Sequence, residues 1–75
     1  MKKIKEYLNS SKLKMNYIDN KLNIVNYTEI VLLTEEKIII KKDNDIIVIN
    51  GKNLSLLKLL EYEILINGTI KSIEL

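Results

Sequence analysis

The stretch from Ile46 to Leu56 constrains the fold of this 75-residue chain more than any other. A run of mostly β-branched residues leads into Asn50-Gly51, and a run of alternating apolar and polar residues follows. Asn-Gly between two such runs is the strongest local signal for a β-hairpin, because a type I′ turn needs positive φ at both central residues. The pattern predicts a two-residue turn at Asn50-Gly51, with positive φ at Gly51.

A second two-residue turn is predicted at Asp43-Asn44, because both residues favour turn conformations. This turn pairs Ile40 with Ile47 and Ile38 with Ile49. Combined with the turn at Gly51, it predicts one continuous apolar face, formed by Ile38, Ile40, Ile47, Ile49, Leu54 and Leu56.

The opposite face carries Ile39, Ile46 and Val48, and it is too apolar to remain open to solvent. These three side chains are the candidate interface. A symmetric dimer would cover them with a second copy of the same face. The alternative is a compact monomer in which the N-terminal strands cover them.

A repeated Ile-x-Ile-Asn-Gly motif occupies residues 47–51 and 64–68. Its spacing fits either a meander of short strands or one coil of a β-solenoid, and two copies are too few to stabilise a solenoid. We therefore expect an all-β domain at residues 13–75, a small antiparallel meander folded into a sandwich or barrel-like sheet of roughly seven or eight strands. A turn is expected at Asp19-Asn20, and a bulge or longer loop at Asn67-Gly68.

Residues 1–12 are predicted as a basic N-terminal tail or a short helix, with Ile4, Tyr7 and Leu8 on one side. The first fifteen residues contain five lysines and one glutamate, so this segment is a candidate for weak contact with an anionic membrane surface. No apolar run reaches the roughly 18 residues of a membrane span. No secretory signal is recognisable, so we expect an intracellular protein.

The composition argues against most catalytic chemistry. The chain contains no cysteine and no histidine, so its serines have no histidine base beside them. Asp43-Asn44-Asp45 begins like a calcium loop, but the required glycine and final acid are missing. No catalytic, cofactor-binding or metal-binding residue is predicted. The net charge of +2 is a weak argument for nucleic acid, although a small nucleic-acid-binding β-barrel is kept as the alternative function.

Three stretches of the chain resemble the YabP/YqfC family of small sporulation proteins, and in particular its YqfC branch. They are Ile24-Val25-Asn26-Tyr27 with Leu33–Ile38 after it, Ile49-Asn50-Gly51-Lys52-Asn53-Leu54, and Ile64–Glu74. The residues that match the family motifs are Asn26, Gly51, Asn53, Leu54 and Gly68. Structural roles account for all five, with positive φ at Gly51 and Gly68 and a side-chain bond from Asn53 to turn backbone.

The resemblance implies a non-enzymatic interaction module that is made in the mother cell during endospore formation. It implies a cytoplasmic protein that acts beside a YqfD-like membrane protein, at the forespore membrane. It transfers no catalytic residue and no cofactor.

Overall fold

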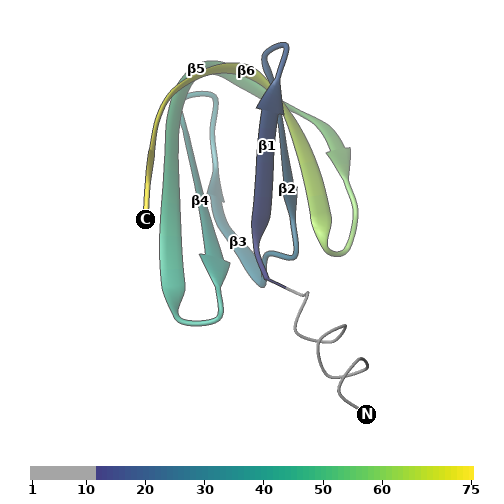
Figure 1. Ribbon diagram of the computed structural model, residues 1–75. Helices are drawn as coiled ribbons and strands as arrows, with labels where there is room; N and C mark the ends of the chain where they lie inside the picture. Colours follow the sequence, from purple (N-terminus) through teal and green to yellow (C-terminus); the bar gives the residue numbers. More distant parts are fainter. Residues whose placement is uncertain (1–11) are drawn as a thin grey trace.

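The computed structural model describes residues 12–75, which form six antiparallel strands in one sheet (Figure 1). The strands are β1 (Lys14–Ile18), β2 (Lys21–Val25), β3 (Glu29–Leu33), β4 (Lys37–Lys42), β5 (Asp45–Leu59) and β6 (Glu63–Glu74). The predicted all-β class is confirmed. There are six strands rather than seven or eight because β5 and β6 are long. The tail or helix predicted for residues 1–12 lies outside the described residues, except for Lys12.

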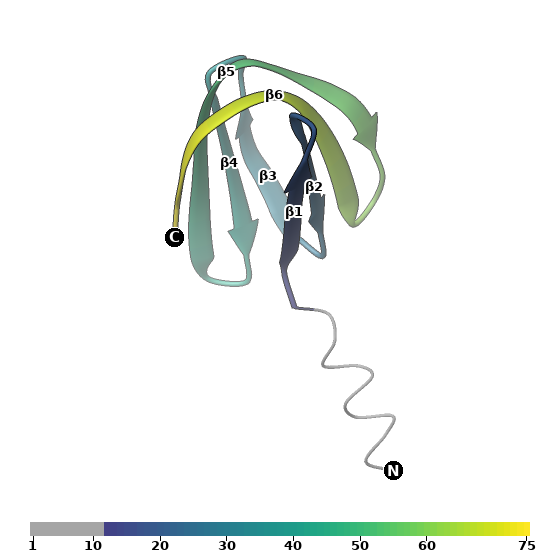
Figure 2. The same cartoon turned by 45° about the horizontal axis from the view of Figure 1, so that its top comes forward.

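The sheet has the strand order β1-β2-β6-β5-β4-β3, and it folds over on itself because β5 and β6 are bent. Strands β3 to β6 follow one another as neighbours, whereas β2 pairs with β6. Figure 2 shows β5 and β6 arching together from one half of the sheet to the other. We call one side the β3–β4 half, with β5 up to Asn50 and β6 from Thr69. The other is the β1–β2 half, with β6 up to Asn67 and β5 from Ser55.

Two predicted turns are confirmed. Asp19 and Asn20 connect β1 to β2, and both have the positive φ that a type I′ turn requires, 53° and 62°. Asp43 and Asn44 connect β4 to β5, with Lys42 opposite Asp45. The predicted register of this second hairpin is also correct, since Ile40 pairs with Ile47 and Ile38 with Ile49.

The prediction of a turn at Asn50-Gly51 is wrong. Strand β5 continues through both residues, and Gly51 lies opposite Ile70 in β6. The hairpin reverses ten residues later, where the Leu60 N–H donates to the carbonyl oxygen of Glu63 at 2.8 Å. Gly51 does not have positive φ. Position 51 needs a glycine because the backbone of β6 approaches closely. A Cβ here would collide with the carbonyl oxygen of Thr69 and with the Leu54 side chain.

Gly68 ends the second copy of the repeated motif, in β6, as Gly51 ends the first copy in β5. It has a positive φ of 143°, as predicted. A Cβ on Gly68 would lie 2.8 Å from the carbonyl oxygen of Asn53 and 2.9 Å from a methyl group of Leu54. Asn67-Gly68 is not a loop, because β6 runs through it. The expected irregularity lies on the neighbouring strand instead, where the pairing of β5 shifts between Lys52 and Ser55.

The repeated motif marks a structural similarity between the two halves of the sheet. In the β3–β4 half, β4 pairs with the first copy of the motif, with Ile38 opposite Ile49. In the β1–β2 half, β2 pairs with the second copy in the same register, with Leu22 opposite Ile66. The glycine that ends each copy donates its N–H to the backbone carbonyl oxygen of the residue just before the paired strand. Gly51 donates to Glu36, before β4, and Gly68 donates to Asn20, before β2, both at 2.9 Å. The repeat therefore builds two equivalent half-sheets, within a sheet in which β3 to β6 form the predicted antiparallel meander.

The core lies between the two halves. Its buried side chains are Leu22, Ile24, Tyr27, Ile38, Ile40, Ile47, Ile49, Leu54, Ile64 and Ile66. The predicted apolar face is correct except for Leu56, which is 37% exposed. Leu56 lies on the part of β5 that pairs with β6 alone, beyond the end of β4, and so the opposite half does not cover it.

Candidate interaction surface

The outer face of the β3–β4 half carries a row of apolar side chains. The strand register places Leu32 opposite Ile39 and Ile39 opposite Val48, and Ile46 lies opposite Lys41 in the next row. Leu32 is 39% exposed and Ile46 is 53% exposed, while Ile39 and Val48 are half-buried. We call these four residues the outer apolar patch. It brings together the three predicted interface residues and adds Leu32.

Leu32 was missed because a bulge reverses the alternation of β3. The register shifts between Ile30 and Leu32, so Ile30 pairs with the buried Ile40 while Leu32 pairs with the half-buried Ile39. Without the bulge, Ile30 and Leu32 would share a face, because side chains two apart in a strand point the same way. The continuous apolar run at residues 30–33 contains no signal for this shift.

The equivalent row of the β1–β2 half is polar at two of its three positions. Asn16 lies opposite Asn23, and Asn23 lies opposite Leu65. The Asn23 amide also donates to the carboxylate of Glu63 at 2.8 Å. Two halves with the same backbone arrangement thus differ in this row, which holds two asparagines and Leu65 in one half and Leu32, Ile39 and Val48 in the other. The difference marks the outer apolar patch as a surface suited to a partner.

Polar groups border the patch. The Asn50 amide donates to the Ser72 hydroxyl at 3.1 Å and lies 3.4 Å from a carboxylate oxygen of Glu74. Glu74 lies opposite Val48 and closes the apolar row on the side of β6. An apolar centre with a hydrogen-bonding rim is the usual arrangement of a protein–protein interface.

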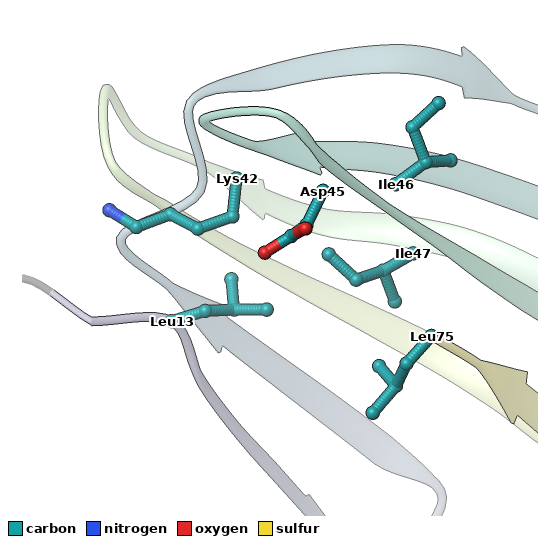
Figure 3. Close-up of a pocket in the computed structure, with 6 residues that line it drawn as sticks. All are labelled: Leu13, Lys42, Asp45, Ile46, Ile47 and Leu75. Carbon is teal, nitrogen blue, oxygen red and sulfur yellow. The ribbon is translucent and has the colours of Figure 1, made fainter.

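A hollow of about 370 Å³ adjoins the patch at Ile46 (Figure 3). Its other lining residues are Leu13, Lys42, Asp45, Ile47 and Leu75. The lining combines apolar side chains from β5 and from the ends of the described chain with one lysine and one aspartate. Ile46 and Ile47 are consecutive in β5, so their side chains point to opposite faces, and Figure 3 shows Ile46 directed away from Leu13, Ile47 and Leu75. The hollow therefore lies mainly on the core side of the sheet and does not enlarge the outer apolar patch.

The residues that match the family motifs do not form a binding surface. Gly51, Leu54 and Gly68 meet where β5 and β6 bend, with Leu54 buried between the two glycines. Asn53 lies in this bend with a positive φ of 55°. The bend is not the turn whose backbone the Asn53 side chain was predicted to bond. Asn26 lies apart, between β2 and β3, with φ of 72° and its N–H 2.6 Å from the carbonyl oxygen of Tyr62.

Tyr27 fixes the segment that connects β2 to β3. Its side chain is buried, and its hydroxyl donates to the carbonyl oxygen of Leu60 at 2.9 Å. Burial raises the pKa of Tyr27, because the ionised phenolate loses its hydration.

Tyr27→Phe should reduce the free energy of unfolding by about 1 kcal/mol at neutral pH, the usual net value of one hydrogen bond. The difference in the free energy of unfolding between the two proteins should narrow above about pH 10, where the tyrosine of the unfolded chain ionises. The folded protein binds this proton more tightly than the unfolded chain, so wild-type stability is lost as pH rises, and the phenylalanine variant lacks this loss. Urea unfolding of both proteins from neutral pH to about pH 11 tests this. A gap that does not change with pH would contradict it.

Comparisons of the chain with protein-family models, with curated proteins and with solved structures give no match. Residues 12–75 contain no helix that is long and apolar enough to cross a membrane. The fold and the surface define a small all-β domain with an outer apolar patch.

Proposed function

We propose that the chain is a non-enzymatic sporulation protein of the YabP/YqfC type, an interaction module that acts with a membrane protein in the mother cell. Two independent features support this proposal. The first is the resemblance of three ordered motifs to that family. The second is the outer apolar patch, in which Leu32, Ile39, Ile46 and Val48 lie side by side on one face of the sheet. The proposed partner is the YqfD-like membrane protein that the resemblance implies, which would hold the chain at the forespore membrane.

The contrast between the two half-sheets is the observation that carries the proposal. Full burial of an exposed Val, Leu or Ile side chain is worth roughly 1.5–3 kcal/mol, and the half-buried members of the patch would gain part of this. The asparagines of the β1–β2 half show that this backbone arrangement accepts polar side chains at equivalent positions. A partner that covers the β3–β4 half therefore contacts Leu32 and Ile39 at the two positions where the β1–β2 half has Asn16 and Asn23.

The alternative function, nucleic-acid binding, would use exposed aromatic side chains as stacking surfaces. Tyr27 belongs to the core instead. The Tyr17 hydroxyl accepts the N–H of Ile70 at 3.2 Å and lies 3.1 Å from the carbonyl oxygen of Gly68, which ties this ring to the bend of β6. Tyr17 and Tyr62 remain 42% and 60% exposed. The outer apolar patch, and not the tyrosines, is therefore what favours the interaction module.

Genetic complementation tests the proposed function. Deletion of the gene should reduce the yield of heat-resistant spores, and the wild-type gene should restore it. Val48→Lys should fail to complement, because it places a charge in the patch. Leu65→Lys is the matched control, because Leu65 is the equivalent position in the β1–β2 half, and it should complement fully.

Normal sporulation in the deletion strain would contradict the sporulation assignment. Equal complementation by the two lysine variants would instead contradict the role of the patch. A second copy of the chain is the competing occupant, through the symmetric dimer that the sequence suggested. Light scattering of the purified protein distinguishes a second copy from the membrane protein as the occupant of the patch. A dimer that Val48→Lys dissociates without unfolding would assign the patch to self-association.

A further inference from the structure

A smaller hollow, of about 210 Å³, opens between the two halves of the sheet beside β3. Leu33 of the β3–β4 half and Leu56 of the β1–β2 half line it, and they are 44% and 37% exposed. Both leucines lie on the core side of the sheet, since Leu33 pairs with the buried Ile38 and Leu56 with the buried Ile66. The hollow is therefore an opening toward the core, and it is not part of the outer apolar patch.

The repeated motif locates the equivalent position on the other side of the core. Leu33 pairs with Ile38, and Tyr17 pairs with Leu22. Ile38 and Leu22 lie opposite the same position of the two copies of the motif. Tyr17 in β1 is therefore the counterpart of Leu33 in β3.

The counterpart of Leu56 follows from the same comparison. Leu56 pairs with Ile66, and Ile73 pairs with Ile49, again the same position of the two copies. Ile73 is 38% exposed, nearly the value of Leu56. Tyr17 and Ile73 therefore flank the position that is equivalent to the hollow.

A tyrosine ring occupies this equivalent position. The Tyr17 hydroxyl accepts the N–H of Ile70 at 3.2 Å and lies 3.1 Å from the carbonyl oxygen of Gly68. Because both partners belong to β6, the ring crosses from β1 in one half toward the part of β6 in the other. Leu33 is shorter than a tyrosine and has no polar end, so on its side of the core the space remains open as the hollow.

Two polar groups that border the hollow are already bonded. The Leu54 N–H donates to the carbonyl oxygen of Glu35 at 2.8 Å. The Thr34 hydroxyl donates to the carbonyl oxygen of Lys37 at 2.9 Å. A hydroxyl buried beside them without a partner would cost free energy, whereas an apolar ring needs no partner. The hollow therefore favours an aromatic ring without a polar group, which is the side chain of phenylalanine.

The size and the place of the hollow fit this occupant. A cavity of about 150 Å³ lined by apolar side chains binds benzene. Leu32 of the outer apolar patch and Leu33 of the hollow are consecutive in β3, the last strand in the order of the sheet. A partner segment that crosses this edge therefore reaches both the patch and the hollow.

We propose that the hollow receives a phenylalanine side chain of the protein that covers the outer apolar patch. The identity of that partner rests on the proposed function, whereas the binding of an aromatic ring in the hollow does not. The two parts are therefore tested separately.

Titration with toluene, the side-chain analogue of phenylalanine, tests ring binding in the full chain. NMR spectra of the leucine and isoleucine methyl groups should show saturable shifts at Leu33 and Leu56. Leu60, at the far end of the β5–β6 hairpin, should show none. Leu33→Phe should abolish the shifts at Leu56, because its own ring fills the hollow. Tyr17→Leu should open a second site, with shifts at Ile73.

If Leu33→Phe unfolds, as judged by circular dichroism, Leu56→Phe replaces it, and the shifts at Leu33 should then be lost. Wild-type protein without saturable shifts would overturn the proposal. So would shifts that persist in the filled variant, or a folded Tyr17→Leu protein without shifts at Ile73.

Capture of the chain by the YqfD-like membrane protein tests the partner. Leu33→Phe should weaken capture relative to wild type, because the hollow is already filled. Leu60→Phe is the matched control, the same change at an exposed leucine outside the hollow, and it should be captured like wild type. Equal capture of the two phenylalanine variants would overturn the proposal. No capture of the wild-type chain would instead contradict the proposed function, and the toluene titration would still decide whether the hollow binds a ring.

Discussion

Replacing Gly51 with asparagine should destabilise the protein by about 3 kcal/mol, the upper range for side chains forced into filled space. The Cβ of any residue at this position meets the carbonyl oxygen of Thr69, a backbone atom that cannot move aside without shifting β6. It also meets a methyl group of Leu54 at 2.8 Å. Equilibrium unfolding in urea measures the loss. Gly51→Val should lose at least as much.

Asparagine is the informative substitution because it separates two explanations of the glycine. In a type I′ turn, asparagine is a favoured residue, and Asn20 shows this in the turn between β1 and β2. A turn at Gly51 would therefore tolerate the change, whereas the bend of β5 does not. Asn20→Gly is the control, and it should change stability by less than about 0.5 kcal/mol, since both residues accept positive φ. Wild-type stability of Gly51→Asn would contradict the observed path of β5.

Truncation of the two equivalent core residues Ile47 and Ile64 should produce the other large effect. Both lie in the repeated motif, with Ile47 3% exposed and Ile64 fully buried. Ile47→Ala and Ile64→Ala should each cost about 2–5 kcal/mol, as large-to-small changes in a packed core do. The two losses should be similar, because each isoleucine pairs with the matching residue of the neighbouring strand, Ile40 in one half and Ile24 in the other.

Ile46→Ala is the matched control for this pair. Ile46 is the sequence neighbour of Ile47, but it is 53% exposed on the outer face. Its truncation should change the free energy of unfolding of the single chain by no more than about 0.5 kcal/mol. Thermal unfolding monitored by circular dichroism ranks the three variants. A loss at Ile46 equal to that at Ile47 would contradict the assignment of inner and outer faces.

Local sequence signals predicted the parts of the fold that local interactions determine. The all-β class, the turns at Asp19-Asn20 and Asp43-Asn44 and the register of β4 on β5 follow from alternation and turn chemistry. The candidate interface was predicted for the same reason, because the register of one hairpin fixes the faces of Ile39, Ile46 and Val48.

Contacts between distant segments decided the rest. Asn50-Gly51 has the composition of a turn, but the carbonyl oxygen of Thr69 is what requires a glycine there, and no local pattern reveals it. The true reversal after Leu60 lacks glycine, so turn chemistry did not indicate it. The bulge that moves Leu32 to the outer face was also invisible, because every residue around it is apolar.

Binding to the membrane protein tests the central claim most directly. A YqfD-like membrane protein, the partner proposed above, is purified in detergent, and its capture of the chain is measured by biolayer interferometry. The outer apolar patch predicts capture of wild type and of Leu65→Lys, with at least about a tenfold loss for Val48→Lys, the equivalent of about 1.4 kcal/mol of lost contact. No capture of the wild-type chain, or equal capture of the two lysine variants, would contradict the claim.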